Sequence, residues 1–254
     1  MKIHYILYSL ICIALALPAA PAFAQDEQLK EAEATYAQGD YTKAAELYRS
    51  ILQTYGESAE AYYNLGNAYY KANDIAPAIL YYERALLIDP GDADIRFNLE
   101  MARQRTVDKI IPIGDFFLVK WLQSVQNMGA ADSWAKFGIG GFLLFIGCLF
   151  LYFFSRQSKL KKLGFYLGIA FLFLVIAANI FARGQKNELS NRNTAIVFSP
   201  TVTVKSSPNQ SGTDLFLLHE GTKVLIRSAI GEWKEIELED GNIGWMPAKD
   251  IEII

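Results

Sequence analysis

Two long apolar runs organise the chain. Residues Phe137–Phe154 and Leu163–Ala182 contain no Asp, Glu, Lys, Arg or His. At a rise of about 1.5 Å per residue, each run forms a helix about 27–30 Å long, which matches the hydrocarbon thickness of a bilayer. The pattern therefore predicts a hairpin of two transmembrane helices, at residues 137–154 and 163–182.

The segment between these runs is short and basic. Residues 155–162 carry Arg156, Lys159, Lys161 and Lys162 and no acidic side chain. Short loops rich in Lys and Arg remain on the cytoplasmic side of a membrane. We therefore expect a cytoplasmic loop at 155–162, with both flanking regions on the other side.

The hairpin carries few polar features. Ionisable residues inside spans mark transport pathways, so their absence argues against a channel or a pump. Gly164 and Gly168 in the second run have a spacing that allows close helix packing. That spacing serves either a contact with another protein or the packing of the two spans on each other.

An amphipathic pattern precedes the hairpin. Residues 112–136 are expected to hold a juxtamembrane helix that lies in the membrane interface, with an aromatic anchor at Trp121. The alternative is that this helix packs on the preceding soluble domain. The apolar positions at helical spacing are Phe117, Leu118, Trp121, Leu122, Val125 and Met128.

The N-terminus has the pattern of a secretory signal. Lys2 supplies the positive start, Tyr5–Leu17 the apolar run, and Ala22–Ala24 a small-residue cleavage site. We therefore predict a signal peptide at residues 1–24. The alternative, a first membrane anchor, is weaker because the apolar run is short.

Between the signal and the hairpin, the sequence repeats with a period of 34 residues. Ala44 and Tyr48 recur as Ala78 and Tyr82. The pattern resembles the tetratricopeptide (TPR) repeat, a pair of helices that stacks into a solenoid. We expect a TPR domain at 25–111, with repeats at about 25–58 and 59–92 and a capping helix at 93–108. The packing positions of the second repeat are Tyr62, Leu65, Gly66, Tyr69, Ala78, Tyr82, Ala85 and Pro90.

A TPR stack binds peptides on its concave face, which the first helix of each repeat lines. For each residue on that face, an ordinary packed or solvated position is the alternative. A chaperone-type carboxylate clamp is not expected, because Asp94 and Asn98 occupy the places of its basic residues. The candidate groove residues are Tyr63, Asn64, Asn67, Tyr70, Lys71 and Asn98.

The C-terminal part reads as short strands after a polar linker at 183–192. Asp240-Gly241 is a tight hairpin dipeptide between two of these strands. Such a pattern predicts a small all-β barrel over residues 193–254. The expected strands are Val202–Val204, Lys223–Ile226, Trp233–Leu238 and Ile243–Met246.

This part resembles bacterial SH3-like (SH3b) domains in the runs Val204–Pro208, His219–Val224, Gly231–Trp233 and Gly241–Trp245. The resemblance implies binding of cell-wall peptide or of other proteins. Strand alternation places Ile236 and Leu238 in the core, and we expect Trp245 there too. Trp233 and Glu235 fall on the outer face as a candidate ligand surface, unless a loop covers Trp233.

Charge and composition exclude several functions. Residues 25–111 carry 9 basic and 15 acidic side chains, a net charge of −6, and residues 190–254 carry 6 and 9, a net charge of −3. Neither soluble part has the basic patch that nucleic-acid binding needs. After the signal, His219 and Cys148 are the remaining histidine and cysteine. We therefore expect no enzyme, no catalytic residue, no cofactor, no metal site and no nucleic-acid partner.

The fold class is thus a multidomain membrane protein with an α-helical TPR solenoid, a two-helix transmembrane hairpin and a C-terminal all-β SH3-like barrel. This order, with the run Ser206–Val224, resembles the BatE family of the Bacteroides aerotolerance operon. The resemblance implies a scaffold in the bacterial inner membrane, with both soluble domains in the periplasm. It implies von Willebrand-type membrane proteins as partners and, through them, a MoxR-type ATPase. The alternative is a cell-wall anchor that binds peptidoglycan peptide through the SH3-like domain.

Overall fold

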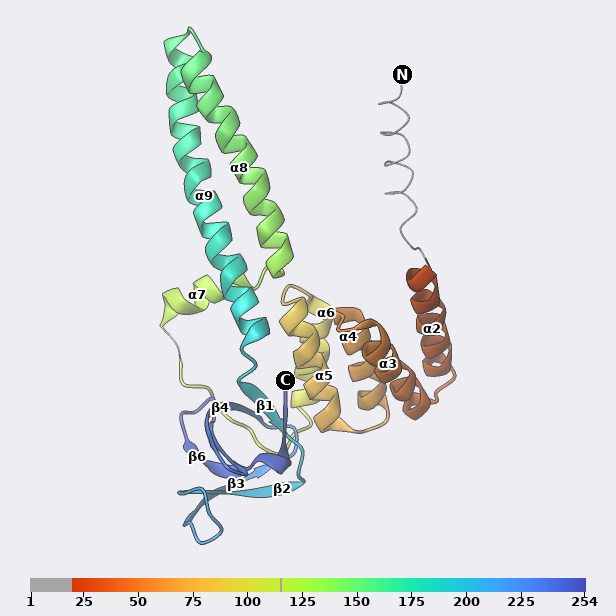
Figure 1. The fold of residues 1–254 in the computed structure, drawn as a ribbon. Coiled ribbons are helices and arrows are strands. Elements are labelled where there is room, and N and C mark those ends of the chain that lie inside the picture. Colours follow the sequence, from red (N-terminus) through yellow and green to blue (C-terminus); the bar gives the residue numbers. More distant parts are fainter. Residues whose placement is uncertain (1–19, 115) are drawn as a thin grey trace.

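The computed structural model describes residues 20–114 and 116–254 (Figure 1). A helical region comes first, two long helices follow, and an antiparallel sheet ends the chain. The predicted signal peptide at 1–24 lies almost entirely outside the described residues, and its cleavage stays a prediction.

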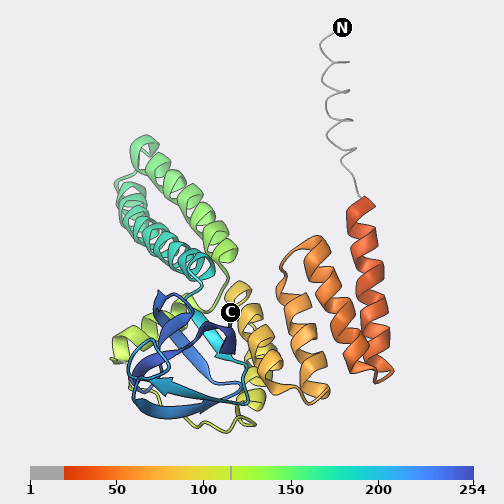
Figure 2. The ribbon, with the colours of Figure 1, turned by 60° about the horizontal axis from the view of Figure 1, so that its bottom comes forward.

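Two helix pairs and a fifth helix form the repeat domain. They stack in sequence order, with α2 at one end of the domain and α6 at the other (Figure 2). The helices are α2 (Ala20–Ala37), α3 (Tyr41–Tyr55), α4 (Ala59–Lys71), α5 (Ile75–Ile88) and α6 (Ala93–Arg103).

Polar caps and tight turns fix the ends of these helices. The side chains of Asp40, Ser58 and Asp92 each accept hydrogen bonds from backbone N–H groups in the first turn of α3, α4 and α6. Gly39 and Asn73, which are 34 positions apart, both adopt positive φ angles, of +87° and +67°. Glycine and asparagine tolerate this left-handed conformation best, so both repeats turn in the same way.

Close contact between α4 and α5 explains the repeat signature. A Cβ atom on Gly66 would lie 2.7 Å from the ring of Tyr82, which is 1% exposed. Leu65, Ala78 and Ala85 are fully buried around this contact. The structure thus places the small signature residues where the two helices approach each other.

The capping helix is shorter than its predicted span of 93–108, because α6 ends at Arg103. Residues 104–114 instead leave the helix and run along the β domain. Ile113 donates a backbone hydrogen bond to the carbonyl of Glu239 at 2.9 Å. Asp108 binds the β domain through its side chain. These contacts replace the last helical turn.

The hairpin consists of α8 (Ala131–Phe154) and α9 (Ser158–Ser190), and both helices are long and apolar enough to cross a membrane. Both extend beyond the predicted spans. The predicted loop at 155–162 shortens to residues 155–157, and the predicted linker at 183–192 is helical as far as Ser190. The added segments 158–162 and 183–190 carry four lysines and two leucines, which favour helix, and contain no proline.

Small residues line the contact between α8 and α9. A Cβ atom on Gly164 would lie 2.8 Å from the carbonyl oxygen of Cys148, and one on Gly168 would lie 3.5 Å from the Cys148 Cβ. The spacing of Gly164 and Gly168 therefore serves the packing of α8 and α9 on each other.

Replacing Gly164 by alanine should destabilise the hairpin by about 1–3 kcal/mol, because a backbone carbonyl cannot move aside for the new methyl group. Gly147→Ala is the matched control, since no atom lies within 4 Å of its added Cβ. The thermal unfolding midpoint of the full chain in detergent micelles, followed by circular dichroism, measures the difference. Equal midpoints for the two variants would contradict this packing.

The C-terminal strands form one seven-stranded antiparallel sheet in the order β3-β2-β6-β5-β4-β1-β7. The predicted barrel is not closed, because β3 and β7 remain at the two edges of the described sheet. The sequence pattern missed β1, β3 and β7. The strands are β1 (Thr194–Val197), β2 (Thr201–Lys205), β3 (Asp214–His219), β4 (Lys223–Ile230), β5 (Trp233–Glu237), β6 (Ile243–Pro247) and β7 (Ile251–Ile253).

The β core contains Ile236, which is 0% exposed, and Leu238, as strand alternation predicts. The expectation for Trp245 is wrong. Met246 is 0% exposed and fills the core position, whereas Trp245 is only partly buried. Trp245 pairs with Glu235 on β5, and directly opposed residues share one face of a sheet, so Trp245 lies on the outer face.

The repeat and β domains pack directly against each other through α5 (Figure 2). Ile196 and Ile254 of the β domain are at most 1% exposed and belong to the same apolar cluster as Ile79 of α5. Arg84 on α5 bonds to the side chain of Glu252 and to the carbonyl of Ile253 at the edge of β7. The α5 helix therefore serves both domains.

Candidate protein-binding groove

A groove opens on the face of the repeat domain formed by α2, α4 and α6. Its cavity has a volume of about 350 Å³. The lining is largely aromatic, and Lys71 supplies its charge. The lining residues are Tyr36, Tyr63, Asn67, Tyr70, Lys71, Tyr82, Phe97, Asn98 and Met101.

Hydrogen bonds between neighbouring helices fix the floor of the groove. The Oδ1 atom of Asn67 accepts a hydrogen bond from the hydroxyl of Tyr82 at 2.7 Å and another from the Nδ2 of Asn98 at 3.0 Å. The Asn98 amide also donates to the hydroxyl of Tyr63 at 2.9 Å. Burial raises the pKa of Tyr82, so its hydroxyl stays protonated and remains a donor.

The structure brings together five of the six predicted groove residues. Tyr63, Asn67, Tyr70, Lys71 and Asn98 line the cavity, whereas Asn64 is half-buried and does not line it. Asn67 and Asn98 form hydrogen bonds with other groove residues, so substituting either one would alter the packing of the groove as well as its binding surface. Lys71 lies on the exposed rim and makes no hydrogen bond to another groove residue in the described part of the chain.

Sequence reasoning missed four residues of the lining, and one of them, Tyr82, was expected only as a packing position. Tyr36 lies on α2, where Glu31, Ala32 and Thr35 stand in place of the Leu, Gly and Tyr of the repeat signature, so this helix carried no signal for groove positions. Phe97 and Met101 lie on α6, and Phe97 is 65% exposed. An exposed aromatic residue next to Asn98 was the available clue, because ordinary solvated helix positions seldom carry phenylalanine.

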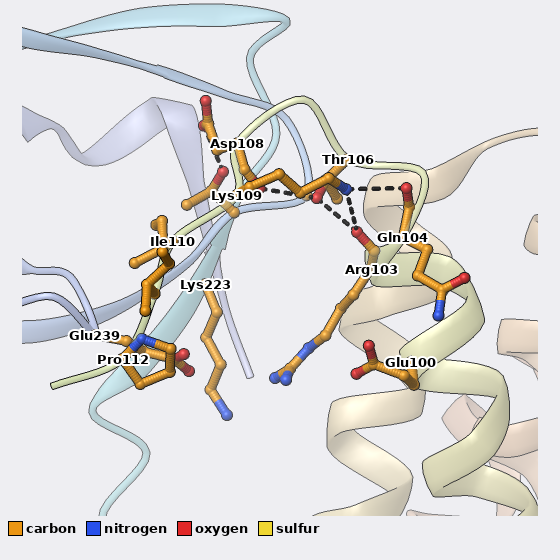
Figure 3. A pocket seen from close by; sticks show the side chains of 13 residues that line it. Glu100, Arg103, Gln104, Thr106, Asp108, Lys109, Ile110, Pro112, Lys223 and Glu239 are labelled. Carbon is orange, nitrogen blue, oxygen red and sulfur yellow. Dashed lines mark hydrogen bonds between the residues drawn. The ribbon is translucent and has the colours of Figure 1, made fainter. Parts of the chain in front are cut away.

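The β domain leaves this groove open. It packs against Ile79 and Arg84 of α5 and along residues 104–114, where a second cleft lies (Figure 3). In that cleft, Arg103 and Lys223 point from the two domains into the same space, and Lys109 donates to the carbonyls of Arg103 and Gln104 at 3.2 and 2.9 Å. These contacts belong to the domain junction.

A second candidate surface lies on the outer face of the β sheet. Trp233 pairs with Pro247, and Glu235 pairs with Trp245, so the four side chains share one face. Trp233 and Glu235 are partly exposed. The hydroxyl of Ser228 donates to the Glu235 carboxylate at 2.9 Å and orients it. The structure therefore adds Trp245 and Pro247 to the predicted ligand surface.

Titratable side chains do not converge on a metal site within residues 20–114 and 116–254. The aromatic groove and its amide network instead fit a segment of polypeptide. They define a helical-repeat domain of the kind that mediates protein–protein interaction.

The comparison with protein families agrees with this class. A tetratricopeptide-repeat family model matches residues 35–100, which extend from the last turn of α2 through most of α6. No curated protein matches the chain. The repeat domain is thus similar to tetratricopeptide repeats, a non-catalytic protein-interaction fold.

Proposed function

We propose that the protein is a membrane-anchored scaffold whose repeat groove captures a segment of a partner protein. The open groove on α2, α4 and α6 carries this proposal. The hairpin holds the groove near a bilayer, and the β domain packs against α5 without contributing to the groove lining. A partner therefore meets the groove at a fixed place relative to the membrane.

The membrane we propose is the bacterial inner membrane, with both soluble domains in the periplasm. Four cations lie at or near the tip of the hairpin, at Arg156, Lys159, Lys161 and Lys162, without an acidic neighbour. At the other end, Asp132 and Glu188 offset part of the charge of Lys136, Arg183 and Lys186. The stronger positive bias at the tip supports a cytoplasmic tip.

The resemblance to the BatE family supports one class of partner. We propose von Willebrand-type membrane proteins, with a MoxR-type ATPase acting through them, in aerotolerance or envelope stress. A cell-wall anchor is the second candidate function. It is favoured by Trp233 and Trp245, which lie on one face of the β sheet and could stack on peptidoglycan components.

Point variants of the full chain separate the two functions. Phe97→Ala combined with Lys71→Glu alters exposed groove positions and leaves the Asn67 network intact. Trp233→Ala alters the β surface instead. We expect the groove variant to lower recovery of co-purified membrane proteins by about tenfold or more, as loss of a central aromatic contact does, with Trp233→Ala unchanged.

The measurement is quantitative mass spectrometry after purification of the tagged chain in a mild detergent. Deletion of a whole domain is less informative, because it would expose Ile79, Ile196 and Ile254. If recovered proteins are unaffected by the groove variant, and peptidoglycan fragments are lost with Trp233→Ala, the scaffold proposal fails in favour of the wall anchor.

A further inference from the structure

The short helix α7 (Phe117–Gln126) exposes an apolar face. None of its ten residues is buried. Soluble surfaces rarely show so dense a cluster of large apolar side chains. The exposed fractions are 72% for Phe117, 51% for Leu118, 55% for Trp121 and 47% for Leu122.

The opposite face of α7 is polar and turns toward the repeat domain. Lys120, Gln123 and Ser124 line a cleft that they share with Pro90 and Gly91, in the turn between α5 and α6. If α7 were one more packing helix of the repeat domain, its apolar face would be the one turned inward. The structure shows the reverse arrangement, so the alternative of docking on the repeat domain does not account for the apolar face.

Polar contacts fasten α7 to the base of the hairpin. The carbonyl of Gln126 accepts hydrogen bonds from the Nε1 of Trp134 at 2.8 Å and from the Nε2 of Gln185 at 3.2 Å. The Gln126 amide donates to Glu188 at 3.2 Å. These bonds hold α7 crosswise to the hairpin, at the level where α9 leaves its apolar stretch (Figure 1).

The same level carries other aromatic side chains. Trp134 packs against Phe181 with ring centroids 5.0 Å apart, where both helices pass from apolar to polar sequence. Tryptophan is enriched at the boundary between lipid and water. The exposed face of α7 therefore continues the apolar surface of the hairpin at its interfacial end.

We propose that the apolar face of α7 is buried in the lipid–water interface of the leaflet next to the soluble domains. The occupant of this face is lipid. The helix would then fix the height of the repeat domain above the bilayer, because the chain just after α7 touches that domain. A Cβ atom on Gly91 of the repeat domain would lie 2.8 Å from the carbonyl oxygen of Met128. This inference goes beyond the proposed function and holds whatever partner the groove binds.

Spin labels on the two faces of α7 test the proposal. Single cysteines are introduced at Leu122, on the apolar face, or at Ser124, on the polar face, with Cys12 and Cys148 replaced by alanine. Both positions are exposed, so a label fits without repacking. The full chain is reconstituted in phosphatidylethanolamine and phosphatidylglycerol vesicles, and collision rates with oxygen and with a water-soluble nickel chelate are measured.

We expect the ratio of oxygen to nickel collisions to be about fivefold higher at Leu122→Cys than at Ser124→Cys, because oxygen concentrates in lipid and the chelate is excluded from it. Leu118→Cys and Gln123→Cys provide a second, independent pair. Equal nickel access on both faces would overturn the proposal. Shielding of the apolar face from oxygen and nickel together would also overturn it, and would assign that face to a second copy or a partner protein.

Discussion

Replacing Glu83 by glutamine is expected to destabilise the contact between the repeat and β domains by about 3 kcal/mol, since removing one member of a buried ion pair leaves the other charges uncompensated. Glu83 is 6% exposed. Its carboxylate accepts hydrogen bonds from Arg103 on α6 and from Lys223 on β4, the latter at 2.7 Å. Glutamine would leave both cations facing each other.

The charge balance of this triad explains the direction of the effect. Burial alone would raise the pKa of Glu83, but the two cations outweigh it and keep that pKa below its usual value. The side chains of Arg103 and Lys223 are 36% and 29% exposed, so both can turn partly to solvent. For this reason we place the effect at the lower end of the range for buried pairs.

Trypsin cleavage after Arg105 and Lys109 measures the separation of the domains, because the segment containing both residues crosses from α6 to the β domain. Urea dependence of this cleavage is followed on the full chain in detergent micelles. Adding Lys223→Met to Glu83→Gln should recover part of the loss, because one uncompensated cation is removed.

The matched control is Glu237→Gln, which removes a partly exposed carboxylate paired with the exposed Arg227 on the neighbouring strand. Surface pairs contribute little, so its cleavage profile should follow that of the unaltered chain. If Glu83→Gln and Glu237→Gln behave alike, the buried triad does not hold the domains together.

The parts of the fold that have a strong local pattern were predictable from the sequence. The 34-residue period and the small residue at Gly66 indicate paired helices, because helices approach this closely only where one side lacks a side chain. The two uncharged runs indicate the hairpin. Five groove residues were predicted from their positions on the first helix of each repeat, because those positions do not depend on where the β domain packs.

The contact between the domains was not predictable, because its residues look ordinary in sequence. Glu83 reads as a solvated charge on a helix, and its partner Lys223 is 140 positions away. In the sequence, Ile196 and Ile254 look like ordinary strand or terminal residues, and nothing near them indicates a contact with α5. Such contacts depend on how domains meet in space, which periodicity does not encode.

The position of Trp245 was misjudged for a different reason. The buried neighbours on its strand are Gly244 and Met246, and a glycine gives no hydrophobic signal that would set the register. The larger side chain was therefore assigned to the core. A shift of one residue moves every side chain to the other face of a strand, so this one choice also hid the tryptophan pair on the outer surface.

Asp108 is the second position at which a single change should have a large effect. Its Oδ2 atom accepts hydrogen bonds from the backbone N–H of His219 and from the hydroxyl of Thr222, both at 2.7 Å, and its Oδ1 lies 2.8 Å from the His219 Nδ1. Asp108→Ala would leave these donors without partners, and Thr222 is 5% exposed. We expect a loss of about 2–4 kcal/mol in the free energy of unfolding.

Asp108→Asn separates hydrogen bonding from charge. An asparagine can accept from the His219 N–H and the Thr222 hydroxyl through its oxygen, and its amide can donate to a neutral His219 ring. At neutral pH the loss should therefore stay below about 1 kcal/mol, as expected when a hydrogen bond is retained without its charge. A loss as large as that of Asp108→Ala would mean that the charge itself carries the contact.

The stability of the unaltered chain and of the Asp108 variants should also differ in its dependence on pH. Burial alone would raise the pKa of Asp108, but hydrogen bonds from Thr222 and His219 outweigh it and lower that pKa below 3.8. A lowered pKa contributes stability above the unfolded-state value, and this contribution disappears as the pH falls through the folded-state value. The pKa of Glu83 is also lowered, from 4.5, so Glu83 too contributes stability that is lost in acid. It is present in the unaltered chain and in both Asp108 variants, so it does not distinguish them.

Denaturant unfolding of the full chain in micelles, followed by tryptophan fluorescence at several pH values from about 6 to 3, measures this linkage. The unaltered chain should lose stability most steeply in the acid part of that range. Asp108→Asn should show a shallower loss, because it has no proton to take up on unfolding at that position. An identical slope in both chains would show that Asp108 does not link the domain contact to pH, and would assign the acid sensitivity to the other carboxylates with a lowered pKa, Glu57, Glu83 and Glu237.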